Sequence, residues 1–346
     1  MVDIANDIVS KISDYRSDDG IQIDAQHVIT WAKQFEDQDQ EFLLTELNHI
    51  LPNSYVAQSD IDEGIESILG YLSSHYGYNS IQEFLRESIF LDCQPNYKSQ
   101  SIILNKVDDF LKNDIGIDID ECGKDGVKYW IYFDDVLASG GTFRNNISEK
   151  LNDYGVENFI NEEIKIVGFF FFLHSWGCGN SKYILNKNIH DQISDRLDIH
   201  YSNEIENNPR INNYNKNPSF NHAYPRKDQE NEKWNNYLDS LEHAEHNRKF
   251  AYRANEQPSE EIFFSSPENR IRYEKIVLDK GLEILERADN LAPSIRPLGI
   301  TTPSYQTFGT GSHAFTWRNI SNTCPIIYWW ENKGWVPLFP VGNRGL

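Results

Sequence analysis

Two adjacent carboxylates, Asp134 and Asp135, follow the apolar run YWIYF at residues 129–133, which is typical of a buried strand. Carboxylates at the end of a strand can accept hydrogen bonds from vicinal ribose hydroxyls and can lie near a metal ion bound to pyrophosphate. They suit a reaction in which positive charge develops on the sugar as a leaving group departs. Adjacent aspartates also occur in Walker B strands, in metal phosphatases and at ordinary strand ends.

The residues after the carboxylates form a turn of a size that suits a phosphate. Small side chains let backbone amides approach an anion, two hydroxyls add donors, and a helix predicted from Gly141 to Tyr154 contributes the positive end of its dipole. The residues concerned are Ala138, Ser139, Gly140, Gly141 and Thr142. We expect this loop to bind a 5′-phosphate, and Mg²⁺ to supply the missing positive charge on a pyrophosphate.

A second polar loop, CQPNYKSQ, lies between a predicted strand at residues 88–92 and a predicted amphipathic helix. It contains Lys98, Ser99 and Gln100. The layout resembles a Walker A loop but lacks the glycines that let backbone amides wrap a triphosphate. The alternative is an ordinary helix N-terminus with Ser99 as its cap.

The elements around these loops predict an α/β fold with a parallel sheet flanked by helices. The run IKIVGFFFFL at residues 164–173 is apolar throughout, as a central parallel strand should be. Strands alternate with helices from residue 88 onward. We expect a helical unit over residues 1–85 and one larger domain over residues 86–346.

Two parts of the larger domain are less regular. Residues 175–265 are predicted to form a long Asn-rich insert with helical pieces near 184–197 and 232–250. Residues 291–346 are predicted to form a C-terminal cap rich in tryptophan. The cap is either a hood that closes one side of a pocket or the aromatic edge of the core.

Composition limits the partners and the compartment. The net charge is −21, and residues 1–127 hold 25 acidic against 8 basic side chains. Such a surface repels phosphate backbones, so direct binding of duplex DNA is not expected, whereas a basic protein could dock there. The acidity otherwise serves solubility. With no long apolar segment and no leader-like start, the sequence predicts a cytoplasmic protein without a membrane span.

The segment YFDDVLASGGT resembles the signature by which type I phosphoribosyltransferases bind phosphoribosyl pyrophosphate (PRPP). Most of the chain resembles the phosphoribosyltransferase-like family of bacterial conflict systems, PRTase-CE. The resemblance rests on VITWAKQF, CQPNYKSQ, the signature, the PENR helix and the tail FGTGSHAFTWRN with PIIYWWENKGWVPLFP. It implies a type I phosphoribosyltransferase-like sheet.

The resemblance also implies roles and a setting. Asp134 and Asp135 would address the ribose, residues 138–142 the 5′-phosphate, and residues 98–100 the pyrophosphate, with Mg²⁺ as cofactor. The setting is antiphage defence, in which such proteins resemble effectors or toxins that accompany a retron reverse transcriptase, its RNA and DNA, and a winged-helix protein. Biosynthetic relatives usually carry threonines where Ala138 and Ser139 stand.

Three functions remain open from the sequence. The first is an Mg²⁺-dependent enzyme that transfers ribosyl groups or hydrolyses an N-glycosidic bond during infection. The second is a catalytically silent regulatory module that binds PRPP or a nucleotide within a defence complex. The third is a hydrolase that acts on NAD or nucleosides. The sequence shows neither a flexible loop that closes over the reacting centre nor a pattern that selects a base.

Overall fold

A computed structural model describes residues 1–96, 98–241, 248–288, 291–331 and 334–341. The chain divides into two compact units, Met1–Ala57 with Ile205–Leu346 and Gln58–Glu204. This division does not coincide with the expected boundary at residue 85. The reason is that helix α4 (Gln58–His75), which the sequence groups with the N-terminal helices, packs against α5 (Ile81–Arg86) and α6 (Ser99–Phe110) instead.

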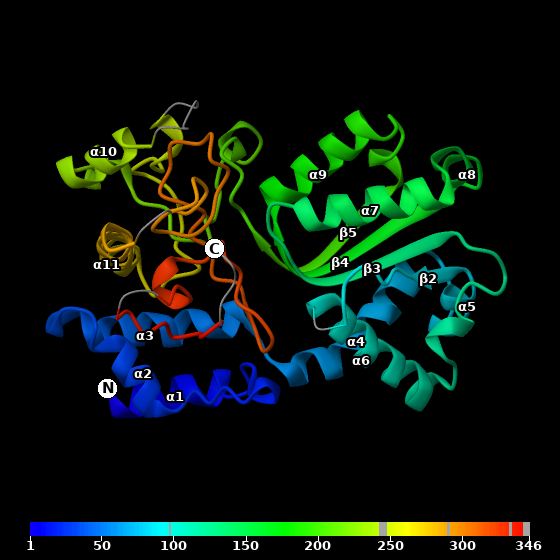
Figure 1. Ribbon diagram of the computed structural model, residues 1–346, viewed down its shortest axis with the longest axis horizontal. Coiled ribbons are helices and arrows are strands. Elements are labelled where there is room, and N and C mark those ends of the chain that lie inside the picture. Colours follow the sequence, from blue (N-terminus) through cyan, green and yellow to red (C-terminus); the bar gives the residue numbers. More distant parts are fainter. Residues whose placement is uncertain (97, 242–247, 289–290, 332–333, 342–346) are drawn as a thin grey trace. The chain divides into compact units, whose positions relative to one another are not determined.

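The unit of residues 58–204 is built on a four-stranded parallel sheet in the order β2-β3-β4-β5 (Figure 1). The strands are β2 (Ser88–Phe90), β3 (Tyr129–Leu137), β4 (Lys165–His174) and β5 (Leu197–Ile205). Nine of the ten residues of β4 are buried, as a central parallel strand requires. The predicted α/β class is therefore confirmed.

Helices cover both faces of this sheet (Figure 1). Helices α7 (Gly141–Tyr154) and α9 (Ser175–Asn188) lie on one face, and α4 and α6 lie on the other. The short helix α8 (Val156–Asn161) follows α7 in the chain. The core beneath α7 is largely aromatic and aliphatic, and it includes Trp130, Tyr132, Phe143, Ile147 and Phe170. The predicted helix at 141–154 has the bounds that the sequence favoured.

The expected insert at 175–265 is not one irregular segment. Its first part forms α9 and the fourth strand β5, which completes the sheet. Its later part contains α10 (Glu232–Asp239) and a short 3₁₀ segment, Arg248–Phe250. Residues 242–247 of the predicted helix at 232–250 lie outside the described residues.

The other unit joins the two ends of the sequence. Its helices are α1 (Val2–Ile12), α2 (Ala25–Ala32), α3 (Asp37–Ser54), α10 and α11 (Pro267–Glu286). A short parallel ladder joins β1 (Tyr55–Val56) to β6 (Phe315–Thr316). Ser266 caps α11 by accepting a hydrogen bond from the backbone of Asn269, and Pro267 follows it as the first helical residue.

The tryptophan-rich tail lies in the core of this unit. The Trp31 ring of α2 stacks on Tyr328 with centroids 5.5 Å apart. The indoles of Trp31 and Trp335 each donate a hydrogen bond of 3.0 Å to the carbonyl of Ile327. Trp317 and Trp329 are also buried. Of the two expectations for the tail, the structure supports the aromatic core.

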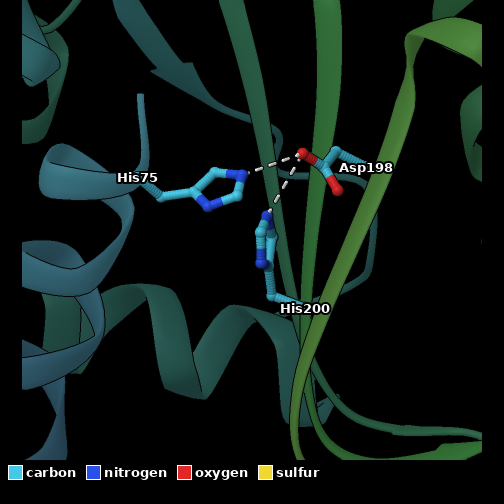
Figure 2. A group of neighbouring side chains, drawn as sticks. All are labelled: His75, Asp198 and His200. Atoms are coloured by element: carbon cyan, nitrogen blue, oxygen red, sulfur yellow. Dashed lines mark ion pairs between the residues drawn. The ribbon is translucent and has the colours of Figure 1, made fainter. Parts of the chain in front are cut away.

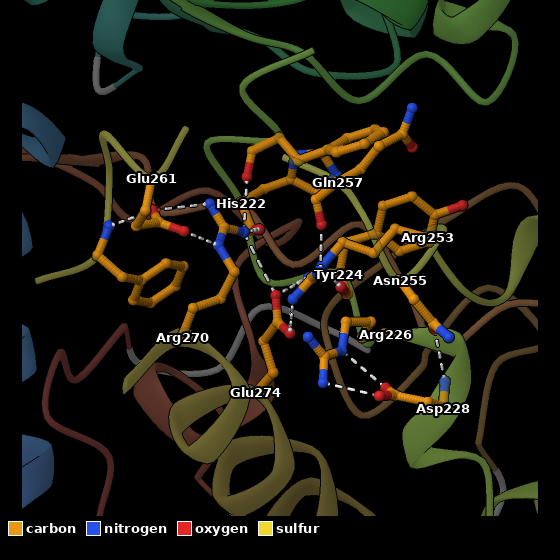
Figure 3. Close-up of polar contacts among 12 residues, drawn as sticks. His222, Tyr224, Arg226, Asp228, Arg253, Asn255, Gln257, Glu261, Arg270 and Glu274 are labelled. Carbon is orange, nitrogen blue, oxygen red and sulfur yellow. Dashed lines mark hydrogen bonds and ion pairs between the residues drawn. The ribbon is translucent and has the colours of Figure 1, made fainter. Parts of the chain in front are cut away.

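Buried ion pairs tie the irregular segments of this unit to α11 (Figure 3). Arg270 and Glu274, one turn apart on the helix, pair with each other, and they reach Glu261 and Arg253 respectively. All four side chains are at most 3% exposed. Two positive and two negative groups therefore balance in a region where an uncompensated charge would be costly.

Among the described residues, no helix is long and apolar enough to cross a membrane.

Candidate active site

Asp134 and Asp135 lie near the carboxyl end of the central strand β3. Ligands of open α/β sheets bind outside this edge of the strands. Both side chains are buried, at 7% and 4% exposure. The strand register pairs Asp134 with Phe170 and Leu137 with Leu173 of β4, so both strands bring their carboxyl ends to one edge.

A network of neutral donors holds the two carboxylates. The Ser99 hydroxyl lies 2.9 Å from Asp134 Oδ1 and 3.0 Å from Asp135 Oδ1. The Gln94 amide donates to Asp134 Oδ2 at 2.7 Å. The Tyr132 hydroxyl, 3.3 Å from the same oxygen, accepts a 3.0 Å hydrogen bond from the amide of Asn146 on α7. Side chains from the second polar loop and from β3, the latter supported by α7, thus hold the two carboxyl groups in place.

Burial, together with the neighbouring charge of Asp135, raises the pKa of Asp134 far above its usual value. The bridging hydroxyl of Ser99 has one proton and cannot donate to both carboxylates at once. A protonated Asp134 resolves this, because it can donate to Ser99 while Ser99 donates to Asp135. In this arrangement each hydrogen bond around Ser99 has one donor and one acceptor, and the pair can hold a hydrogen-bonding or cationic ligand.

This raised pKa predicts a specific pH dependence of stability. The folded protein holds the Asp134 proton more tightly than the unfolded chain, so the carboxyl favours folding at low pH. That contribution declines as the pH rises above about 4, the ordinary carboxyl value. We expect the unfolding free energy of Asp134→Asn, relative to the parent protein, to be larger at about pH 8 than at about pH 5.

Urea unfolding at the two pH values measures this difference. Asp153→Asn, a replacement on the exposed face of α7, is the control and should leave the pH dependence unchanged. A constant difference between Asp134→Asn and the parent protein would contradict the proton-sharing arrangement.

The loop that follows β3 presents backbone donors at the start of α7. Gly140, the residue before the helix, has a left-handed conformation with φ of 73°. Among the described residues, the N–H groups of Ala138, Ser139 and Gly140 have no hydrogen-bond acceptor. The side chains of Ser139 and Thr142 are exposed. Free amides beside a helix N-terminus and two hydroxyls can accept an oxyanion.

Close packing of α9 sets the shape of this loop. A Cβ on Gly140 would lie 1.9 Å from Ser181 Oγ, and a Cβ on Gly177 would lie 1.8 Å from the carbonyl oxygen of Ala138. Neither distance leaves room for a side chain. The loop therefore has its conformation because two glycines, 37 residues apart in the sequence, let it pack directly on α9.

Gly177→Ala is expected to displace the loop and to lower the unfolding free energy by about 1–3 kcal/mol, since backbone must move to admit the methyl group. Gly179→Ala on the same helix is the matched control, because its Cβ would meet no atom within 4 Å. The control should gain up to about 1 kcal/mol from helix propensity. Thermal unfolding measures both, and equal effects of the two replacements would contradict the role of Gly177.

Arg144, in the first turn of α7, was not singled out from the sequence. Its guanidinium donates to the Ser139 carbonyl at 2.8 Å and lies 3.4 Å from Ser181 Oγ. Partial burial lowers its pKa, although arginine keeps its charge at neutral pH. It brings a cation to the phosphate-sized loop. A position three residues after a glycine pair at a helix start is the signal that could have identified it.

The second polar loop divides into different roles. Ser99 contacts both carboxylates, as described above. Gln100 is fully buried, where its amide donates to the Phe133 carbonyl at 3.2 Å and its oxygen accepts from the Cys93 backbone at 2.9 Å. Gln100 therefore ties the loop to β3 and does not join the groups expected to face pyrophosphate. Lys98 is exposed at the start of α6.

His174, the last residue of β4, is a further group at the carboxyl end of the strands, and no motif in the sequence marks it. It is fully buried, and burial lowers its pKa to about 3. The imidazole is therefore neutral at physiological pH.

Comparison with known proteins identifies the family. The PRTase-CE family model matches residues 28–341. Curated proteins and solved structures give no significant match. The family match covers most of the chain, including both polar loops, the sheet and the aromatic tail, and it agrees with the α/β fold. The chain therefore belongs to PRTase-CE, the phosphoribosyltransferase-like family of conflict systems.

Proposed function

We propose that the protein is an effector of a bacterial antiphage system of the retron type. It binds PRPP, or a related phosphorylated ribose or nucleotide, and transfers the ribosyl group or hydrolyses the N-glycosidic bond, which makes it toxic to the infected cell. The observation that carries this proposal is the buried Asp134–Asp135 pair at the end of β3, followed directly by a loop with free amides.

The two halves of the site would divide the substrate between them. The amides of residues 138–140, the Ser139 and Thr142 hydroxyls and the Arg144 guanidinium would hold the 5′-phosphate. Asp134 and Asp135 would accept hydrogen bonds from the ribose hydroxyls. When the bond between C1′ and the pyrophosphate or base breaks, their negative charge would stabilise the positive charge that develops on the ring.

The residues fit a magnesium ion at this place. Asp134 and Asp135 offer hard oxygen ligands, which Mg²⁺ prefers, directly or through water molecules. Their mutual repulsion in a buried position favours a cation there. When bound, Mg²⁺ would neutralise charge on the departing pyrophosphate. Lys98 would add a second positive charge on that side.

In this proposal the protein acts with partners. A retron reverse transcriptase with its RNA and DNA, and a winged-helix protein, would hold it inactive until infection. The acidic first third of the sequence suits a basic protein surface, and no direct contact with duplex DNA is required.

A second function is a regulatory module that binds PRPP or a nucleotide without turnover. One feature favours it: Asp134 and Asp135 already have hydrogen-bond partners in the protein, so a ribose would have to displace Gln94 or Ser99. A sensor can use such an exchange to report that the ligand is bound.

Incubation with a nucleotide pool, PRPP and Mg²⁺, followed by mass spectrometry, separates these functions. Multiple-turnover release of pyrophosphate or free base supports the enzyme. Calorimetric binding of PRPP without product over hours supports the regulator. Loss of NAD or nucleosides while PRPP is unchanged would point to the hydrolase, and neither binding nor turnover would contradict the proposal.

A further inference from the structure

A group of two histidines and one aspartate lies where the end of α4 meets the start of β5, the outer strand of the same sheet (Figure 2). His75 is the last residue of α4, whereas Asp198 and His200 belong to the start of β5. Both β5 residues stand on one side of the strand, because side chains alternate along it. The three side chains converge from a helix and an edge strand that are more than 120 residues apart in the sequence.

This group is separate from the candidate active site. It contacts Tyr76, whose ring lies 4.6 Å from that of Tyr129, the first residue of β3. Asp135 follows six residues later on the same strand, which is roughly 20 Å away at strand rise. The two clusters therefore cannot share one ion.

Two of the three distances between the ligand atoms match a tetrahedral metal site, and all three atoms lie within 4.8 Å of one another. Asp198 Oδ2 lies 3.4 Å from His75 Nε2 and 3.6 Å from His200 Nε2. Zinc bonds of about 2.0–2.2 Å place neighbouring ligand atoms of a tetrahedron roughly 3.3–3.6 Å apart. Ligand atoms much closer together would leave no room for an ion between them, and ligand atoms much farther apart would have to move together to bind one.

The neighbouring tyrosines prepare the ligands for this role. The Tyr71 hydroxyl lies 3.1 Å from His200 Nδ1 and can accept its proton, which leaves the lone pair of Nε2 toward Asp198. The Tyr76 hydroxyl donates to Asp198 Oδ2 at 2.8 Å. Metal-binding histidines usually donate their second ring N–H in this way, and ligating carboxylates usually accept a further hydrogen bond.

Access and burial also suit a bound ion. His200 is 7% exposed and held in place, whereas His75 and Asp198 are 42% and 40% exposed. An ion can therefore reach the group from solvent, and a water molecule can complete the tetrahedron on the open side.

We propose that His75, Asp198 and His200 bind one divalent cation of the zinc class, with water as the fourth ligand. The ion fastens the end of α4 to the edge strand β5 and so stabilises the sheet unit. Two imidazoles and one carboxylate favour Zn²⁺ over Mg²⁺, which prefers oxygen ligands.

The test is titration of the metal-stripped full-length protein with Zn²⁺ by calorimetry, and with Co²⁺ by absorption spectroscopy. We expect one equivalent to bind, Co²⁺ to show the intense bands of a tetrahedral site, and Zn²⁺ to raise the melting temperature. His75→Ala and Asp198→Asn should each weaken Zn²⁺ binding by at least about 100-fold, and Tyr71→Phe by about 10–100-fold. His75 is exposed, so its replacement is expected to leave the fold intact.

His190→Ala is the matched control. His190 also faces an aspartate, Asp191, at 3.3 Å, but it belongs to no such three-ligand group among the described residues. Its replacement should leave binding and the Co²⁺ bands unchanged. Absence of Zn²⁺ binding, or binding that persists in both His75→Ala and Asp198→Asn, would overturn the proposal and leave an ordinary ion pair. The failure of either proposal leaves the other standing.

Discussion

Asp135→Asn is expected to lower product formation from PRPP or a nucleotide by about 100-fold or more, because the site then loses one of the two carboxyl groups placed to stabilise positive charge on the ribosyl ring. Asp134→Asn should also lower product formation, because an amide offers the ribose hydroxyls one acceptor oxygen where the carboxyl group offers two, and the double replacement should be at least as severe as either single one. Preorganised charge acts most strongly in a buried site, and both carboxylates are less than a tenth exposed. Cellular toxicity should fall in parallel.

The expected loss of activity is separable from loss of fold. Burial raises the pKa of Asp134, so ionisation of this carboxyl in the unfolded chain costs the folded protein stability above about pH 4; Asn removes that cost and should preserve or increase stability at neutral pH. A variant that is folded and more stable, yet inactive, is the pattern expected when a protein maintains charge at a functional site. Asp153→Asn on α7 is the control and should retain activity.

Product formation by mass spectrometry and toxicity on induction measure this prediction together. Unchanged turnover in the double variant would exclude the two carboxylates from the reaction. Unchanged toxicity in a variant that has lost turnover would separate the toxic effect from ribosyl chemistry and would favour the regulatory function.

The sequence predicted those parts of the site that depend on local signals. The apolar run before Asp134, the small residues after it and the amphipathic helix from Gly141 are consecutive, and each is specified by its own residues. Ser99 was also expected in the site, although not as a bridge between the carboxylates.

The missing parts depend on contacts between distant residues. Gly177 is required only because α9 packs on the carbonyl of Ala138, and nothing near it in the sequence announces that contact. Strand β5, LDIHYSNEI, does not stand out in the sequence, because an edge strand carries polar residues and lacks the apolar run of β4. The sequence places Gln100 among the ligand-binding residues. In the structure its side-chain oxygen and nitrogen both form hydrogen bonds with the backbone, which the sequence does not reveal.

The division of the chain into two units also depends on contacts between distant segments, which local patterns in the sequence do not predict. Trp31 and Tyr328 stack although nearly 300 residues separate them, and the N-terminal helices share a core with the tail. Periodicity predicted the helices themselves, but it carries no information on which distant segment covers their apolar face.

The largest effect on stability is expected for Glu274→Ala, which should lower the unfolding free energy by about 3–5 kcal/mol. Glu274 is completely buried and accepts hydrogen bonds from Arg253 at 2.9 Å, Arg270 at 3.3 Å and the Tyr224 backbone at 3.1 Å (Figure 3). Alanine would leave two buried guanidinium groups with one carboxylate, that of Glu261. Chemical unfolding measures the loss.

Glu283→Ala on the same helix is the matched control. It removes a glutamate that pairs with Arg287 one turn away, but the Glu283 side chain is 38% exposed. Exposed pairs contribute about 0–1 kcal/mol, so this replacement should have little effect. Similar losses for both variants would show that the buried cluster has no special weight in the stability of α11.

Glu274→Gln distinguishes charge from hydrogen bonding in the cluster. Glutamine keeps an oxygen that can accept from Arg253 or Arg270, yet it leaves the same excess of positive charge as alanine. If charge balance dominates, Gln should destabilise nearly as much as Ala; if hydrogen bonding dominates, Gln should recover most of the loss. We expect the first result, because Arg270 also donates to the backbone carbonyls of Phe220 and His222 and so keeps hydrogen-bond partners even without Glu274.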